Sequence, residues 1–305
     1  MTAAATAAVA VAYAADAVVG EFPGRVHPVA AFGRAVAPLD REWTRPGVVG
    51  AAATVALPLV AAGVCWAVVA GPARLGDATL AQAATAVAAG TVLFSTTSLR
   101  MLLAVAGDVI DATETDLAVA RERVRALVGR ETDGLDAADL RSAAVESAAE
   151  NLADGLVAPL SAFAVGAQVS LAVGAAAAGW VKAVNTMDSM LGYRSKPVGR
   201  ASARLDDAVV WLPARATAAL LAVAGRAPGS LARARRWADE PASPNSGWPM
   251  ATLATVLGVR LRKPGAYDLV AGPALPTVTA ARRGVRVVAV AGGLVGLLVG
   301  VVVWP

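Results

Sequence analysis

Three acidic residues follow one another at four-residue spacing in the middle of the chain: Glu146, Glu150 and Asp154. On a helix, this spacing places the three carboxylates along one face. No Lys or Arg stands between them, so their charges would repel one another unless a cation neutralised them. A divalent metal or a cationic substrate would do so, and Mg²⁺ fits best among metals because it prefers oxygen ligands and substrate phosphates. A solvated acidic face is the alternative.

A second polar group stands at the end of a long apolar run. Asn185 and Asp188 lie three residues apart and share a helix face, with Ser189 beside them and Gly192 placed to end the helix. These side chains supply hydrogen-bond donors and acceptors but no strong nucleophile. They suit the orientation of a ligand, or metal ligation by Asp188.

Two further motifs follow. Asp206 and Asp207 come directly after Arg204 and an intervening leucine, an arrangement that can hold a phosphate-bound Mg²⁺ or simply pair the acids with Arg204. The turn at 243–249, which contains Asn245, either caps a pocket or only turns the chain.

The inventory of reactive side chains excludes several kinds of site. One cysteine, Cys65, cannot form an intrachain disulfide or a cysteine-cluster metal site. The single histidine, His27, excludes His-rich metal sites, disfavours a Ser-His-Asp triad, and is more often structural than catalytic when it stands alone. Neither a P-loop nor a convincing G-x-G-x-x-G is present, so a nucleotide site would be non-standard. Carboxylates, amides and arginines must carry any chemistry.

The elements that position these residues are apolar. The chain of 305 residues is 57% hydrophobic and 16% charged, whereas soluble domains have about 45–50% and about 25%. A transmembrane helix needs about 20 mostly apolar residues. Uncharged runs at 47–71, 155–181 and 287–304 meet this requirement, and runs at 1–20 and 78–99 are weaker candidates. We therefore predict an all-α, multi-pass integral membrane protein, with residues 1–305 in a single membrane-embedded domain, in preference to a soluble Ala-rich bundle.

Polar segments at 100–154 and 182–286 separate these runs, and in the first of them Asp136 is predicted to be the N-cap of a helix that continues through Asp154. The second is rich in Lys and Arg, which places it on the cytoplasmic side; topology alone would explain this charge, and so would the binding of anionic substrates. A single crossing at 155–181 would put the acidic row (Glu146, Glu150 and Asp154) and the Asn185 group (Asn185, Asp188 and Ser189) on opposite membrane faces. We therefore predict a bent or re-entrant hairpin that turns near Gly166 and returns both groups to the cytoplasmic side.

Taken in order, these motifs resemble the membrane-bound adenosylcobinamide-phosphate synthase family of cobalamin biosynthesis. The similarity covers nearly the whole chain, and the ordered set of motifs is highly specific. It comprises Asp16 and 20–29, Ala120-Arg121, Gly-Arg-Glu-Thr at 129–132, ESAAENLADG at 146–155, KAVNTMDSMLGYR at 182–194, ARLDDAVVWLPAR at 203–215, SPNSGWP at 243–249, Gly265 and Tyr267. Glu21-Phe22, Glu131, Val210 and Met250 depart from the family pattern, and no function is carried over to them.

The resemblance implies an ATP-dependent amide bond between adenosylcobyric acid and (R)-1-amino-2-propanol phosphate. This reaction suits the residue inventory, because ATP would activate the carboxylate and the enzyme would mainly position the reactants and stabilise charge. The implied cofactors are ATP and Mg²⁺, and the implied location is the inner cell membrane with a cytoplasmic active site. Implied partners are the two substrates, the lipid bilayer and other cobalamin-pathway membrane enzymes, with no nucleic acid.

The residue roles expected from motif and resemblance fall into three classes. Catalytic roles are assigned to Glu146, Glu150 and Asp188, and metal ligation to Asp154, Asp206 and Asp207. Substrate binding is assigned to His27, Arg130, Asn151, Asn185, Ser189, Tyr193, Arg194, Arg204, Arg215 and Asn245.

Two other functions fit a chain of this composition. A transporter of a polar solute would line its path with the acids, although no inverted repeat is visible and the motifs cluster in polar segments. A membrane scaffold for corrinoid enzymes would tolerate neutralisation of Glu146, Glu150 and Asp154 together.

Overall fold

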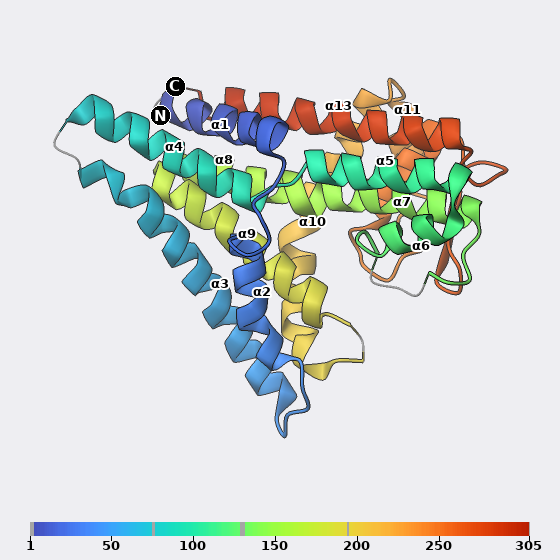
Figure 1. Ribbon diagram of the computed structural model, residues 1–305, viewed down its shortest axis with the longest axis horizontal. Coiled ribbons are helices and arrows are strands. Elements are labelled where there is room, and N and C mark those ends of the chain that lie inside the picture. The colour runs from blue at the N-terminus through green and yellow to red at the C-terminus, as the bar shows by residue number, and fades with distance from the viewer. Residues whose placement is uncertain (1–2, 75–76, 129–131, 194, 305) are drawn as a thin grey trace. The chain divides into compact units, whose positions relative to one another are not determined.

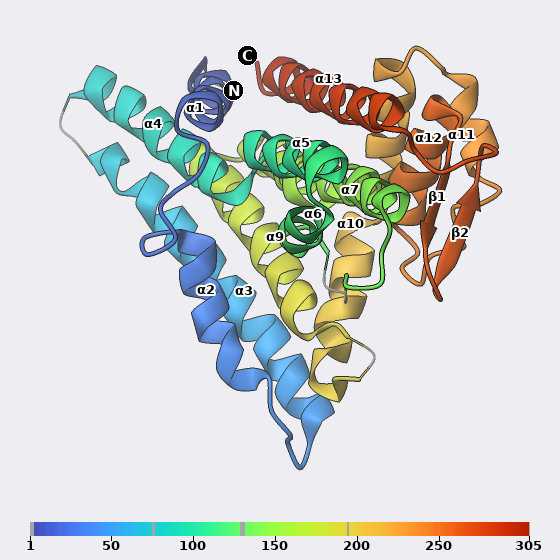
Figure 2. The ribbon, with the colours of Figure 1, turned by 45° about the vertical axis from the view of Figure 1, so that its right-hand side comes forward.

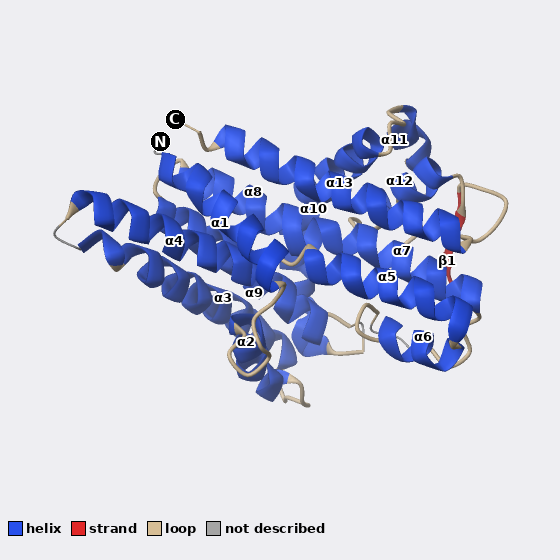
Figure 3. Ribbon diagram, turned by 45° about the horizontal axis from the view of Figure 1, so that its top comes forward, coloured by secondary structure: helices blue, strands red, loops and turns tan. Residues whose placement is uncertain are grey.

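The computed structural model describes residues 3–74, 77–128, 132–193 and 195–304 (Figure 1). Helices make up nearly all of the regular structure, and the sheet found within these ranges has two short strands (Figure 3). The all-α class predicted from the sequence is confirmed. The chain divides into two compact units: unit 1 comprises residues 1–98, 158–210 and 296–305, and unit 2 comprises residues 99–157 and 211–295.

Unit 1 is built around the long helix α9 (Leu171–Leu191), which packs against α2, α3, α4 and α8. Figures 1 and 2 both show α3 beside α9. The apolar side chains of Val36, Met187, Leu191 and Val198 form a buried cluster at one end of this packing. The remaining elements of unit 1 are α1 (Ala3–Val19), α2 (Pro28–Val36), η1 (Ala37–Leu39), α3 (Pro46–Ala70), η2 (Pro72–Arg74), α4 (Ala78–Thr96), α8 (Ala158–Ala167), η4 (Pro197–Gly199), residues 200–210 of α10 (Arg200–Ala224) and residues 296–302 of α13 (Val278–Val302).

Within the uncharged run at 155–181, residues 158–181 form a helical hairpin inside unit 1. Helix α8 ends at Ala167, the chain turns over residues 168–170, and α9 returns along α8. Ser170 begins α9 as its N-cap, because its hydroxyl accepts the backbone N–H of Val173. The turn therefore lies next to Gly166, the position that the sequence predicts. The hairpin requires glycine at Gly166, where an added Cβ would stand 2.8 Å from the Cα of Gly174.

Gly166→Val is expected to lower the free energy of unfolding by about 1–3 kcal/mol, because the added side chain would force the two helices apart. Thermal unfolding in detergent, followed by circular dichroism, measures the change. Gly63→Ala in α3 is the matched control, since no atom lies within 4 Å of the Cβ that it adds. An equal melting temperature for Gly166→Val and the wild-type chain would refute the close packing of α8 on α9.

Within the described residues, four helical stretches are long and apolar enough to cross a membrane: Pro46–Ala70, Ala78–Thr115, Pro197–Ala224 and Val278–Val302. Three of them overlap runs that the sequence singles out. Pro197–Ala224 lies instead within the segment treated above as polar, because its charges gather in its first half and leave an apolar stretch behind them. Helix α1 is apolar but shorter, and the hairpin at 155–181 is not among the four.

Unit 2 has α7 (Ala137–Leu152) at its centre, packed against α5, α6, α12 and β1. Asp136 caps this helix as the sequence predicts: its carboxylate accepts the N–H groups of Ala138 and Asp139, each at 2.8 Å. The other elements of unit 2 are α5 (Arg100–Thr115), α6 (Leu117–Val124), η3 (Ala153–Val157), residues 211–224 of α10, α11 (Gly229–Ala234), α12 (Gly247–Leu257), β1 (Arg260–Lys263), β2 (Tyr267–Val270) and residues 278–295 of α13.

The strands β1 and β2 form an antiparallel hairpin beside α12 (Figure 2). Leu261 and Leu269 are paired and fully buried, so one face of the hairpin is anchored in the core of unit 2. The turn contains Gly265 with a φ of 76°, a backbone conformation that favours glycine. The sequence shows no strong strand pattern here, because each strand has only four residues and neither RLRK nor YDLV alternates apolar with polar side chains throughout.

Candidate functional site

The first residue of the acidic row, Glu146, is buried within unit 2, and both of its carboxylate oxygens accept hydrogen bonds. One carboxylate oxygen accepts the Ser142 hydroxyl at 2.6 Å, and the other accepts the Tyr267 hydroxyl at 2.7 Å. Ser142 in turn accepts the backbone N–H of Arg262 at 2.9 Å. Glu146 is only 4% exposed, so it does not belong to a solvated acidic face. Its contacts join α7 to the β-hairpin.

Glu150 and Asp154 stand in a different setting, because α7 ends between them. The chain changes from α-helix to a π-helical turn at Ala153–Val157, which contains Asp154. The chain therefore stays helical through Asp154, as the sequence predicts, but the α-helical spacing of the first two acids gives way to a π turn at the third. Both acids are half-buried. A π turn within a helix is frequently found at a functional site.

The side chain of Asn151, which follows Glu150 in the sequence, is fixed by hydrogen bonds within α7. Its side-chain amide donates to the Ser147 hydroxyl at 2.9 Å and to the Ser147 carbonyl at 3.0 Å. Ser147 itself donates to the carbonyl of Leu127 at 2.9 Å. The amide oxygen of Asn151 is thereby held in one orientation and remains able to accept a hydrogen bond.

Unit 1 carries the second acidic group, on α9 and α10. Asp188 and Asp207 are half-buried, while Asn185 and Asp206 are buried. The pKa of Asp188 is raised to about 6. Burial is the larger cause, and the negative charge of Asp207 is the smaller one. Two carboxylates that disfavour each other's charge are stabilised by a cation placed between them.

Gly192 leaves open the space that the Asp188 carboxylate occupies. Helix α9 ends at Leu191, as the sequence predicts, and the N–H of Gly192 donates to the carbonyl of Asp188 at 2.7 Å. An added Cβ at Gly192 would collide with Oδ1 of Asp188. The glycine is thus required by space, since its φ of −69° is open to any residue.

For the amide formation that the sequence resemblance implies, we expect Gly192→Ala to slow the reaction by about 10- to 100-fold, because it displaces the Asp188 carboxylate. The rate of corrin product formation measures the effect, and thermal unfolding shows whether the chain remains folded. Gly107→Ala serves as the control, because its Cβ would meet no atom within 4 Å. Wild-type turnover in Gly192→Ala would show that the position of this carboxylate does not matter.

The acids fit a Mg²⁺ ion held jointly with substrate phosphates. Within the described parts of the chain, no group of three or more His, Cys, Asp or Glu residues is arranged to hold a metal ion. Of the expected metal ligands, Asp206 and Asp207 belong to unit 1 and Asp154 belongs to unit 2. Mg²⁺ commonly binds through one or two carboxylates together with waters and phosphates, and the pair Asp188 and Asp207 matches that requirement.

Arg215 and Asn245 are brought together in unit 2, where Arg215 fixes the turn at 243–249. The Arg215 guanidinium donates to the Asn245 side-chain oxygen and to the carbonyls of Pro244 and Trp211. It also lies 4.5 Å from the ring centre of Trp211 and 5.3 Å from that of Trp248. These contacts position the turn, and this role competes with the phosphate-binding role expected of Arg215. Asn245, which accepts from Arg215, is buried.

His27 has a local structural role in unit 1. Its Nδ1 accepts the backbone N–H of Val29 at 3.1 Å, which caps the first turn of α2. Its Nε2 lies 3.2 Å from a carboxylate oxygen of Glu21. Both ring nitrogens are engaged, which supports the structural interpretation of a lone histidine over the substrate-binding one.

The remaining expected binding residues lie at the surface of unit 1 or outside the described residues. Ser189, Tyr193 and Arg204 are exposed, and Lys196 stands 5.1 Å from the Tyr193 ring centre. Arg130 and Arg194 are outside the described residues.

Tyr267 is the residue whose role the sequence does not reveal, since its partner Glu146 is 121 positions away. Its side chain enters the sequence argument only through the family motif. The convergence of Glu150 with Asp188 stays a prediction, because they belong to unit 2 and unit 1 respectively.

Comparison with known proteins gives one consistent match. A family model described as CobD/Cbib protein matches residues 9–290. A "Probable cobalamin biosynthesis protein CobD" from Methanothrix thermoacetophila is 36% identical over 269 residues, which cover 83% of each chain. A cobalamin biosynthesis protein CobD from Mycobacterium tuberculosis is 39% identical over 261 residues, covering 83% of this chain and 79% of the relative. No solved structure matches the chain.

Proposed function

This chain belongs to the CobD/Cbib protein family of cobalamin biosynthesis, and from that membership we propose that it joins adenosylcobyric acid to (R)-1-amino-2-propanol phosphate. The product is adenosylcobinamide phosphate, and the reaction consumes ATP. The observation that carries the proposal is the pair of acids Asp188 and Asp207 in unit 1, which are coupled electrostatically and only partly exposed. Such a pair suits a Mg²⁺-bound phosphate, because Mg²⁺ commonly binds one or two carboxylates together with phosphate oxygens.

The chemistry needs activation because a carboxylate is a poor electrophile. The terminal phosphoryl group of ATP is transferred to the carboxylate oxygen of the corrin acid, and ADP leaves. The amine then attacks the carbonyl carbon, inorganic phosphate departs, and the amine gives up a proton. The overall change is acid, amine and ATP to amide, ADP and phosphate, and no protein nucleophile is required.

The residues divide this work according to their surroundings. Asp188 and Asp207 would hold the Mg²⁺ that neutralises the phosphate charge. Glu150, which is half-buried, would accept the proton of the amine. Glu146 has both oxygens committed to Ser142 and Tyr267, so we assign it the role of a positioning residue for α7 in place of the catalytic role expected from sequence.

Charge and hydropathy support a location in the inner cell membrane with the reaction on the cytoplasmic side. The four candidate spans supply the membrane anchor. Lys and Arg predominate over Asp and Glu at 225–286, which follows the candidate span Pro197–Ala224, as they do in cytoplasmic segments. ATP is a cytoplasmic substrate, which is consistent with this orientation.

Reconstitution in lipid vesicles tests the proposed function. The chain is supplied with adenosylcobyric acid, ATP, Mg²⁺ and either the phosphorylated or the unphosphorylated amine, and the mass of the corrin product is measured. We expect a corrin amide and one ADP for each amide formed. Movement of unchanged corrin into the vesicles would favour a transporter. A corrin that stays unchanged while ATP, Mg²⁺ and both amines are present would contradict the ligase.

A further inference from the structure

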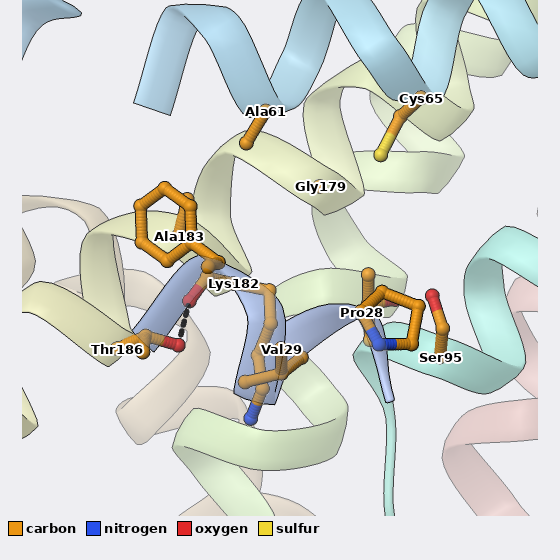
Figure 4. A pocket seen from close by; sticks show the side chains of 11 residues that line it. Pro28, Val29, Ala61, Cys65, Ser95, Gly179, Lys182, Ala183 and Thr186 are labelled. Atoms are coloured by element: carbon orange, nitrogen blue, oxygen red, sulfur yellow. Dashed lines mark hydrogen bonds between the residues drawn. The ribbon is translucent and has the colours of Figure 1, made fainter. Parts of the chain in front are cut away.

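A surface groove in unit 2 is much larger than the cavity of unit 1 that Figure 4 shows. In that cavity, Ala61 and Cys65 of α3 face Gly179 of α9 across a volume of about 70 Å³, which has room for only a few water molecules. The groove has a volume of about 470 Å³. This volume lies within the range of small-molecule pockets, about 300–1,000 Å³, so the groove can take a ligand of that class.

The groove lies between α5 and the first part of α13, which run antiparallel within unit 2. Figure 1 shows α13 lying along α5. At one end of this packing, Arg282 of α13 contacts Asp111 of α5. At the other end, a Cβ at Gly292 would stand 2.7 Å from the side chain of Leu99, which precedes α5. The described lining residues are Gly107, Asp111, Thr279, Arg282, Val285 and Arg286.

The lining of the groove carries a net positive charge, because two arginines and one aspartate contribute to it. Arg282 is already paired: its guanidinium donates twice to Oδ1 of Asp111, at 3.0 and 2.8 Å, and lies 3.7 Å from Glu114. Arg286, one helical turn further along, is exposed, and its side chain forms no hydrogen bond or ion pair with another described residue. Its guanidinium donors are therefore available to an anion.

The position of Arg286 along α13 indicates where this anion comes from. Arg286 is the last charged residue of the candidate span Val278–Val302. The uncharged residues 287–302 extend for about 24 Å, which is most of the hydrocarbon thickness of a bilayer, about 30 Å. Arg286 then lies at the depth of the lipid head groups. Beyond it, Val290 is 51% exposed and a Cβ at Gly293 would meet no atom within 4 Å, so this face of α13 is open to acyl chains.

We propose that this groove binds the head group of an anionic glycerophospholipid such as phosphatidylglycerol. The phosphodiester accepts from Arg286, whose planar guanidinium can donate to two phosphate oxygens at once. Thr279 and Asp111 supply partners for the head-group hydroxyls, and the acyl chains lie along α13 beyond Val290. Basic pockets between membrane helices bind phosphate-bearing head groups in this way. The net positive charge of the groove favours an anionic lipid over a zwitterionic one.

Native mass spectrometry of the delipidated chain in mild detergent tests the site, because it resolves the number and the affinity of bound lipids. Phosphatidylglycerol and phosphatidylcholine with the same acyl chains are titrated in separate arms. Two further arms add inorganic phosphate or glycerol 3-phosphate to the phosphatidylglycerol complex. We expect phosphatidylglycerol to bind about fivefold or more tightly than phosphatidylcholine, and we expect it to stay bound at equal concentrations of the soluble phosphates.

Arg286→Gln removes the positive charge and should weaken phosphatidylglycerol binding about tenfold, as expected for loss of a charge-assisted hydrogen bond. Arg283→Gln is the matched control, because Arg283 is an exposed arginine of the same helix that does not line the groove. We expect wild-type affinity from it. Gly107→Phe fills the groove without changing a charge, and a Cβ at this position meets no atom within 4 Å. It should weaken binding by a similar factor while the melting temperature stays that of the wild-type chain.

These outcomes do not depend on the proposed function, because no turnover is measured. Equal phosphatidylglycerol affinity in the wild-type chain and in Arg286→Gln would overturn the lipid site. Equal losses in Arg286→Gln and Arg283→Gln would show a general attraction between charges and would overturn it as well. Phosphatidylcholine that binds as tightly as phosphatidylglycerol would contradict the choice of an anionic lipid. Displacement by either soluble phosphate would assign the groove to a soluble anion in place of a lipid.

Discussion

Asp188→Asn is expected to lower the rate of amide formation by about 100-fold or more while the chain remains folded. Asparagine keeps the shape of the side chain but removes the charge that would hold Mg²⁺ against the substrate phosphate. Losses of about 10²–10³ are typical when one preorganised electrostatic group is removed from an active site. The measurement is the turnover of adenosylcobyric acid in lipid vesicles at saturating ATP, with Mg²⁺ varied. Asp207→Asn should show a loss of the same kind, since the two acids are neighbours.

Asp77→Asn is the matched control for this charge removal. Asp77 is an exposed N-cap of α4, and its carboxylate accepts the N–H of Leu80 at 2.7 Å. Asparagine caps helices about as well as aspartate, so this variant loses a carboxylate of unit 1 without losing a structural role. Turnover in Asp188→Asn equal to that of Asp77→Asn would remove Asp188 from the site.

The second large effect concerns stability: Glu146→Ala should lower the free energy of unfolding by about 3–5 kcal/mol. The change leaves the hydroxyls of Ser142 and Tyr267 without their acceptor inside unit 2, and breaking a buried charged network costs about this much. Chemical denaturation in mild detergent, followed by tryptophan fluorescence, gives the value. Tyr267→Phe removes only one of the two bonds and should cost less, about 1–3 kcal/mol.

A double-mutant cycle shows whether these two residues act together. Because Tyr267→Phe and Glu146→Ala remove the same hydrogen bond, their effects should fall short of additivity by about 0.5–3 kcal/mol. Strict additivity would contradict the contact. Glu146→Gln separates the two roles of this residue, since a positioning residue should keep turnover within about tenfold whereas a catalytic acid should not.

The predictions that succeed rest on signals that act within a few residues. Asp136 starts α7 because its carboxylate caps the next two backbone N–H groups, and Gly192 ends α9 at the predicted place. The turn near Gly166 follows from a different argument, which is that two motifs flanking one apolar run need to face the same side. Hydropathy alone located most of the candidate spans, because length and composition decide them.

What the sequence does not reveal depends on distant contacts or on small departures from regular geometry. The residues near Glu146 do not indicate that the Tyr267 hydroxyl will donate to its carboxylate. The residues near Arg215 do not indicate that its guanidinium will donate to the turn at 243–249. The π turn at Ala153–Val157, which contains Asp154, has no visible sequence signal. The span at Pro197–Ala224 was missed because Asp206 and Asp207 stand within it.

The sequence predicts that Glu150 and Asp188 serve one reaction centre, and an intramolecular cross-link between positions 150 and 188 tests this prediction most directly. Glu150→Cys and Asp188→Cys are combined with Cys65→Ser, and the lipid-reconstituted chain is treated with a short bismaleimide. Cleavage at methionine separates the two positions, because Met187 lies between them. We predict that the fragment containing position 150 carries the tripeptide 188–190 as added mass. If both cysteines react with a monofunctional maleimide and still never become linked, the two acids do not share a site, and the account is contradicted.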